Sequence, residues 1–291
     1  MQMLQAWRCA LLSLALGVSS LAGAANPPLK VFISVDMEGI TGVYSAKEVS
    51  RGEPDYPYFR EIMTRDTNAA IEGAFAAGAT DVLVREGHGG MNHLLIDMLD
   101  KRVRIVRGPT HPQSMMVMME GFDDSFDAVV LLGYHASTNY PNSILPHTMG
   151  KEVVYFKVNG QSQSEGSYNA LIAGRYDVPV VMLAGDKAAC EEARKIIAPN
   201  MEVVAVKEAL NGGVITLHPQ TARKLIRDAT ERGVRNRASI RPYKLTPPYA
   251  ITMKVDEPRK LMAGASLNAA GEIEFTSPDL YQALNAMVQM W

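Results

Sequence analysis

Short apolar, β-branched runs alternate with helical patterns along most of the chain, and this alternation limits the possible folds more than any other feature. The runs have the length of strands, while the segments between them repeat apolar residues at helical spacing. Such alternation is typical of a mostly parallel sheet flanked by helices, because parallel strands need long crossover connections. We therefore predict an α/β fold. The predicted strands are Leu29–Val35, Asp81–Val84, Val103–Val106, Ala128–Leu132, Pro179–Ala184 and Glu202–Val206, and the predicted helices between them are Tyr58–Ala77, a short one near Asn92–Asp100, Ser167–Ala173 and Lys187–Ile197.

Two later parts of the chain depart from this alternation. Residues Glu152–Ser164 alternate around Asn159-Gly160, which predicts a β-hairpin with a tight turn. After Val206 the sequence predicts a helix from about residue 219 to 233, two strands in "YAITMKV" and "GEIEF", and a last helix from Pro278. We expect residues 25–291 to form one unit with a smaller C-terminal α+β subdomain at about 207–291.

The first 24 residues are typical of a secretory signal peptide. A single positive charge at Arg8 precedes an apolar segment that runs from Cys9 to about Leu21, and Ala22-Gly23-Ala24 follows as a small-x-small cleavage site. An uncleaved membrane anchor is the alternative, but the segment is short for one. We therefore expect a periplasmic or secreted protein that has no membrane attachment after cleavage.

Charge and cysteine content restrict the partners and the possible metal ligands. The 291 residues carry a formal net charge of -2 without a Lys/Arg block, which argues against nucleic acid or an anionic membrane surface as a partner. Loss of Cys9 with the signal peptide leaves Cys190 alone, so no intramolecular disulfide can form. Any tightly bound metal must then be held by histidines and carboxylates.

Metal-ligating residue types follow three of the predicted strands. The first strand is followed by Asp36 and Glu38, the strand at Asp81–Val84 by His88, and the strand at Ala128–Leu132 by His135. In an open parallel sheet, ligands bind at the carboxyl ends of the strands, so these side chains converge if the strands are neighbours. A further carboxylate, Glu165, lies between the hairpin and the next helix. Two imidazoles and three carboxylates are enough ligands for two divalent cations with one bridging carboxylate.

The charge of this cluster supports a pair of metal ions. Asp36 and Glu38, two residues apart on an extended chain, would point the same way and repel each other. Two dications remove that repulsion, and against three carboxylates they leave a net charge of about +1 that a bridging hydroxide neutralises. Such a hydroxide is the nucleophile that a hydrolase requires.

Each residue of the cluster also has a simpler interpretation. A histidine after a strand is commonly a core or surface residue, Asp before a turn is common, and Glu165 favours a helix N-terminus. Their joint placement at strand ends favours metal binding. The remaining histidines do not share that placement, and we leave out His93, His111 and His218.

His147 occupies a loop that contains Pro141, Pro146 and Gly150. It is either an inert loop residue or an imidazole positioned near the metals. In the second case it would transfer protons or stabilise an oxyanion.

Five motifs together resemble the D-aminopeptidase family of binuclear zinc peptidases. They are "SVDMEGITGV", "GHGGMN", "LLGYHA", "PHTM" and "SEGSYNALIAG", the last followed by "YDVPVVMLAGD", and the resemblance runs in order from about Leu29 to the C-terminus. The combination of the first motif with "LGYHA" is the specific part.

The resemblance implies site residues, cofactor, activity and assembly. It implies that Asp36, Glu38, His88, His135 and Glu165 are the ligands of two Zn²⁺ ions per chain, with Asp36 as the bridge. It implies that His147 is the catalytic histidine. It further implies that N-terminal D-amino acids are removed from short peptides, and that the chain assembles into a ring-shaped homo-oligomer such as a decamer.

The sequence departs from the family pattern at two positions near these motifs. Gly87 precedes His88 where serine is expected, and Lys187 stands where an acidic residue is common. A secretory signal is a further departure. These differences affect the expected substrate more than the expected metal ligands.

Three functions are consistent with these observations. The first is an exported dinuclear zinc aminopeptidase in which a metal-bridged hydroxide attacks the scissile carbonyl of small D-residue peptides. The second is a zinc amidohydrolase of another small amide. The third is an exported peptide-binding protein without catalysis, although the sequence shows no second lobe of comparable size.

Overall fold

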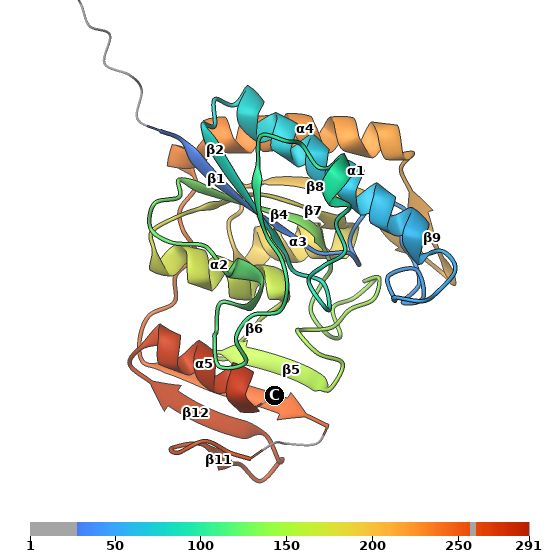
Figure 1. Cartoon of the computed structure of the whole chain (residues 1–291). Coiled ribbons are helices and arrows are strands. Elements are labelled where there is room, and N and C mark those ends of the chain that lie inside the picture. The colour runs from blue at the N-terminus through green and yellow to red at the C-terminus, as the bar shows by residue number, and fades with distance from the viewer. Residues whose placement is uncertain (1–27, 257–259, 291) are drawn as a thin grey trace, which may run out of the picture.

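A computed structural model describes residues 28–256 and 260–290 and contains a large, mostly parallel sheet (Figure 1). Its strand order is β3-β2-β1-β4-β7-β8-β9, and only β9 runs antiparallel to its neighbour. This confirms the predicted α/β fold. The strands are β1 (Lys30–Val35), β2 (Asp81–Glu86), β3 (Arg104–Val106), β4 (Ala128–Tyr134), β7 (Val180–Asp186), β8 (Glu202–Leu210) and β9 (Gly213–Thr216).

Helices cover both faces of the large sheet. Helices α1 (Tyr56–Ala76) and α4 (Pro219–Arg235) lie side by side on one face, and α2 (Glu165–Arg175) and α3 (Lys187–Ile196) lie on the other (Figure 1). Gly73 allows α1 to approach α4 closely, because a Cβ atom there would lie 2.3 Å from the carbonyl oxygen of Arg227. The predicted short helix near residues 92–100 is only a 3-10 turn at Ile96–Met98, where Leu95 provides no side-chain cap.

A second, antiparallel sheet has the order β11-β12-β10-β5-β6 and packs against α5 (Leu280–Met290). Its strands are β5 (Val153–Val158), β6 (Gln161–Ser162), β10 (Tyr249–Val255), β11 (Ser266–Leu267) and β12 (Ile273–Ser277).

The smaller unit therefore does not coincide with residues 207–291. The hairpin β5–β6 joins it because β5 pairs with β10. The end of β8 from Lys207 to Leu210, all of β9 and helix α4 belong instead to the large sheet and its covering layer.

The parallel register brings three strand ends to one edge. Val35 pairs with Glu86 of β2 on one side and with Leu132 of β4 on the other, so the residues after β1, β2 and β4 lie next to one another.

Cys190 is buried and free. Within the described ranges, no helix combines the length and apolarity needed to cross a bilayer. The predicted signal peptide at residues 1–24 lies outside those ranges.

Candidate metal centre

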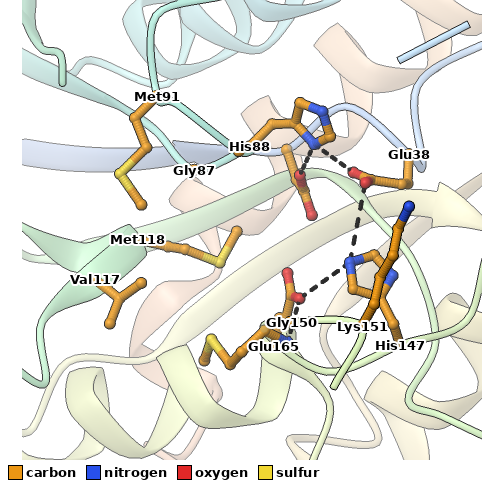
Figure 2. A pocket seen from close by; sticks show the side chains of 13 residues that line it. Glu38, Gly87, His88, Met91, Val117, Met118, His147, Gly150, Lys151 and Glu165 are labelled. Atoms are coloured by element: carbon orange, nitrogen blue, oxygen red, sulfur yellow. Dashed lines mark hydrogen bonds and ion pairs between the residues drawn. The ribbon is translucent and has the colours of Figure 1, made fainter. Parts of the chain in front are cut away.

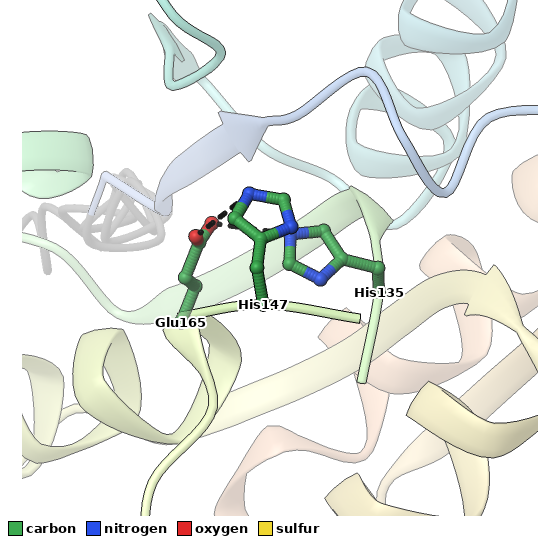
Figure 3. Close-up of side chains that lie close together, drawn as sticks. All are labelled: His135, His147 and Glu165. Atoms are coloured by element: carbon green, nitrogen blue, oxygen red, sulfur yellow. Dashed lines mark ion pairs between the residues drawn. The ribbon is translucent and has the colours of Figure 1, made fainter. Parts of the chain in front are cut away.

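The six residues singled out from the sequence come together at the carboxyl edge of the large sheet. Asp36 directly follows β1, His88 follows β2, His135 follows β4, and Glu165 begins α2. All but His135 line a cavity of about 320 Å³ (Figure 2). His135 lies behind His147, with the two rings stacked 4.0 Å apart and inclined by 11° (Figure 3).

A turn after β1, rather than strand alternation, brings Asp36 and Glu38 together. Strand β1 ends at Val35, and residues 37–40 form a tight turn. The turn packs on the end of β4 through hydrogen bonds from the Asp36 N–H to the Leu132 oxygen at 2.8 Å and from the Gly39 N–H to the Gly133 oxygen at 2.7 Å. Gly39 is required there because its Cβ would lie 2.0 Å from the Tyr134 oxygen. The two carboxylates do lie together, but the expectation that both project from one face of an extended strand was wrong.

The potential ligands form two adjacent groups. One contains Asp36, Glu38 and His88, and the other contains His135, His147 and Glu165; within each group, one potential ligand atom per residue lies within 4.8 Å of the others. Inclusion of His147 in the second group was not expected from the sequence.

Asp36 connects the two groups. Its Oδ1 lies 3.4 Å from His88 Nδ1, and its Oδ2 lies 3.5 Å from His135 Nε2. One oxygen of the carboxylate thus faces each group, which is the arrangement that a bridging ligand needs.

Backbone carbonyls orient the three imidazoles. His88 Nε2 lies 3.0 Å from the Val49 oxygen, His135 Nδ1 lies 3.0 Å from the Ala136 oxygen, and His147 Nδ1 lies 2.9 Å from the Leu145 oxygen. Each ring nitrogen facing a carbonyl must donate, and the assigned tautomer then leaves the other nitrogen free toward the carboxylates. Metal-ligating histidines are commonly oriented by such outer hydrogen bonds.

Two buried atoms at the junction of the groups lack hydrogen bonds within the described part of the chain. They are Asp36 Oδ2 and His135 Nε2, the pair that face each other at 3.5 Å. Buried polar atoms are nearly always paired, and leaving them unpaired is costly. A shared cation would satisfy both, so the residues fit a metal centre.

The ionisation of the site is strongly perturbed. Burial and the neighbouring Glu38 raise the pKa of Asp36 well above its usual value. Burial by itself lowers the pKa of His135, but Glu165 and Asp36 raise it to about 10. The cluster therefore retains protons at neutral pH, and these must leave when cations bind.

Glu165 is held in place from two sides. Ser164 caps α2 and forms a capping box with Ser167, which fixes Glu165 as the first residue of the helix. Its Oε1 accepts a hydrogen bond of 2.6 Å from the Met149 N–H, and Oε2 lies 3.5 Å from His135 Nε2. Glu165 is thus a helix N-terminal residue, as the simpler interpretation held, and also part of the buried cluster.

Reasoning from the sequence missed one buried cation beside the site. Lys207 lies in β8, one residue beyond the predicted strand, and its ammonium group donates to the backbone oxygens of Glu38 and Val43. The strand-end argument that identified His88 and His135 applies to Lys207 as well. His93, left out earlier, packs behind His88 with ring centroids 4.8 Å apart.

The two departures from the family pattern differ in their distance from the site. Gly87 lines the cavity. Lys187 is exposed at the start of α3, where its Nζ pairs with Glu208 Oε2 at 3.0 Å, and it does not line the cavity.

Known proteins are similar to this chain in both sequence and fold. The sequence profile of a family described as D-aminopeptidase matches residues 29–289. A D-aminopeptidase of Bacillus subtilis (strain 168) is 35% identical over 271 residues, which cover 90% of this chain and 96% of that protein. The zinc-dependent D-aminopeptidase DppA from Bacillus subtilis, a self-compartmentalizing protease, superposes with a TM-score of 0.84 at 32% identity, covering 89% of this chain and 96% of that one. The resemblance drawn from the motifs is confirmed: the chain belongs to the D-aminopeptidase family, a family of peptidases.

Proposed function

We propose that the protein is an exported dinuclear zinc aminopeptidase that removes N-terminal D-amino acids from short peptides. The observation that carries the proposal is the position of Asp36, whose two carboxylate oxygens face separate ligand groups at 3.4 and 3.5 Å. The zinc dependence of the similar DppA supports the choice of metal.

The ligands divide between the two groups. Asp36, Glu38 and His88 would hold one zinc ion, and Asp36, His135 and Glu165 the other. When bound, the ions supply a Lewis acid that polarises the scissile carbonyl and lowers the pKa of a coordinated water.

His147 is placed to handle protons during the reaction. Its Nδ1 faces the Leu145 oxygen, so Nε2 is the nitrogen available to the cavity. The side chain is 25% exposed, whereas that of His135 is fully buried. An imidazole in this position can accept a proton at Nε2 from the attacking water; once protonated, it can donate a hydrogen bond to a developing oxyanion or pass that proton to the departing amine.

The cavity favours small substrates. Its volume of about 320 Å³ lies at the lower end of the range for small-molecule sites. Short D-residue peptides, such as fragments of cell-wall stem peptides, are therefore the substrates that we propose.

Export and assembly are further parts of the proposal. The charged start, apolar segment and Ala22-Gly23-Ala24 pattern support cleavage near Ala24 and a periplasmic or secreted mature chain. Intact-mass measurement on protein from a fractionated native host tests this, and an unprocessed cytoplasmic chain would contradict it. The self-compartmentalizing nature of DppA supports a ring-shaped homo-oligomer such as a decamer, and sedimentation of the mature protein tests this assembly.

The activity is tested with matched dipeptides. Metal-loaded mature protein is incubated with D-Ala-D-Ala, D-Ala-L-Ala, L-Ala-L-Ala and N-acetyl-D-Ala-D-Ala, and free amino acid is measured beside metal content. We expect release only from the two peptides with a free N-terminal D-residue, loss of release after chelation, and close to two zinc ions per chain. Cleavage of other amides alone would support the amidohydrolase alternative. Tight binding without release would support the peptide-binding alternative.

A further inference from the structure

One half of the cavity is apolar. Met91, Val117 and Met118 lie together on the side away from His147 and Lys151, and Gly87 lies next to them (Figure 2). None of these four residues is among the metal ligands or the proton-handling groups named above. Methionine side chains are flexible and adapt to apolar ligands of different shape, so a wall of them is suited to receive a side chain.

Val117 is held in an unfavourable backbone conformation within this wall. Its φ angle is +39°, in a region that β-branched residues rarely adopt. Such strain persists only where the surrounding structure enforces it, and it is found often at ligand sites.

Hydrogen bonds from Arg85 hold Val117 in this conformation. Its side chain is fully buried, and both Nε and Nη2 donate to the Val117 carbonyl oxygen, at 3.2 and 3.0 Å. The same guanidinium group donates to Gly108 O at 2.8 Å, to Thr110 Oγ1 at 2.9 Å and to the Met91 sulfur. A rigid fork of donors therefore fixes both Met91 and the Val117–Met118 turn.

Gly87 makes room for the end of Met118. A Cβ atom at position 87 would lie 2.5 Å from Met118 Cε and 3.1 Å from the Val35 oxygen. The backbone of Gly87 is not among the glycines with positive φ, so the Met118 methyl group is the main obstacle to a side chain there. Met118 is 2% exposed and lines the cavity. A side chain at position 87 would therefore push the Met118 methyl group into the cavity.

We propose that Gly87, Met91, Val117 and Met118 form the pocket for the side chain of the peptide's N-terminal residue. Gly87 sets the depth of this pocket, which accepts apolar side chains larger than methyl, and Arg85 is a positioning residue that holds its wall. The assignment of the bound residue as N-terminal rests on the proposed aminopeptidase function.

The test compares D-Leu-Gly with D-Ala-Gly. In Gly87→Ala, kcat/KM for D-Leu-Gly should fall on the order of tenfold relative to D-Ala-Gly, because one misplaced methyl group in an apolar pocket changes discrimination by about that much. Met118→Ala should raise the D-Leu-Gly to D-Ala-Gly ratio, and the double variant should no longer show the Gly87→Ala effect. The control is Met119→Ala, which removes an equally buried methionine from the same turn outside the cavity and should leave the ratio unchanged.

The substitution Arg85→Lys keeps the positive charge but removes the planar set of guanidinium N–H donors. It should raise KM for D-Leu-Gly more than for D-Ala-Gly while kcat stays near the wild-type value. A merely structural role would instead lower the melting temperature and reduce both substrates' rates in parallel.

Binding measurements separate this inference from the proposed function. If no D-peptide is cleaved, calorimetry with D-norleucine and D-alanine on the metal-loaded protein still tests the pocket. Wild-type protein should bind D-norleucine more tightly, and Gly87→Ala should reduce that preference on the order of tenfold. Equal ratios in the wild type, Gly87→Ala and Met118→Ala, with all three folded by melting temperature, would overturn the inference.

Discussion

Lys207 donates a hydrogen bond from its buried ammonium group to the backbone carbonyl oxygen of Glu38. A second bond of 2.6 Å goes to the Val43 oxygen, and the side chain is nearly inaccessible to solvent. Strand β8 thereby holds the turn that carries Asp36 and Glu38, although β1 and β8 are not neighbours in the sheet. Both of these hydrogen bonds go to backbone oxygens, so they leave the Glu38 carboxylate available to His88.

Replacement of Lys207 by methionine should weaken zinc binding. Methionine fills a similar volume but leaves both carbonyl oxygens unpaired, so the turn loses its support. Loss of an outer partner of a metal ligand typically lowers affinity on the order of 10- to 100-fold. Chelator competition measures the zinc dissociation constants. Lys187→Met is the matched control, since it removes an exposed lysine away from the cavity; equal affinity loss in both variants would argue against the positioning role.

Asp66→Asn should stabilise the protein at neutral pH but not in acid. Asp66 is fully buried in α1 and accepts hydrogen bonds from Thr41 Oγ1 at 2.8 Å and Thr41 N–H at 3.3 Å. Burial raises its pKa from 3.8 to about 6. The folded state therefore binds the proton more tightly than the unfolded state, and ionisation costs stability as pH rises from about 4 to about 6.

The expected difference follows from this shift in pKa. The rise in the pKa of Asp66 lowers the free energy of unfolding of the wild type by about 3 kcal/mol above pH 6, and it has no effect near pH 4. Urea unfolding of metal-free wild type and variant at several pH values measures it. Asp97→Asn, which removes an exposed carboxylate, serves as control. A stability difference that does not change between pH 4 and pH 7 would refute the assignment to Asp66.

The strand-end residues were predictable because each strand is recognisable from its own sequence and a general rule of sheet geometry relates the strand ends. Apolar β-branched runs separated by helices imply parallel strands, and parallel strands bring their carboxyl ends to one edge. Asp36, His88 and His135 follow directly from this rule.

Other features depend on contacts between distant parts of the chain. Strand β5 joins the smaller sheet by pairing Val158 with Ile251, and nothing in either segment specifies that partner. The position of Glu38 depends on a turn that packs on Gly133, and the conformation of Val117 depends on Arg85. Such features arise from tertiary packing and cannot be read from local propensity.

Asp36→Asn should reduce metal content more than Glu38→Gln. Asp36 faces both His88 and His135, so its loss affects two coordination spheres. The Glu38 carboxylate contacts His88 Nδ1 at 2.8 Å and lies 3.9 Å from His147, so we expect its loss to affect mainly the first ion. Elemental analysis after dialysis against one zinc buffer provides the comparison. Equal retention in the two variants would show that the bridge is assigned wrongly.

His147→Ala should lose most of its turnover and keep both metals. The geometry brings His147 Nε2 to 3.5 Å from Glu165 Oε1, close enough for a ligand, so the experiment must separate two roles. Partial exposure and attachment to a loop favour a catalytic role, and Asp36 Oδ2, at 3.5 Å from His135 Nε2, can serve in place of His147 as the third ligand beside His135 and Glu165.

The expected loss of rate is on the order of a hundredfold to a thousandfold, as for removal of other acid–base or oxyanion-stabilising groups. His88→Ala should instead lose metal and activity together, and His111→Ala, at an exposed loop position, should change neither. Metal content and turnover are measured on the same preparation of each variant. A metal-depleted His147→Ala would make His147 a ligand, and a fully active one would make it an inert loop residue.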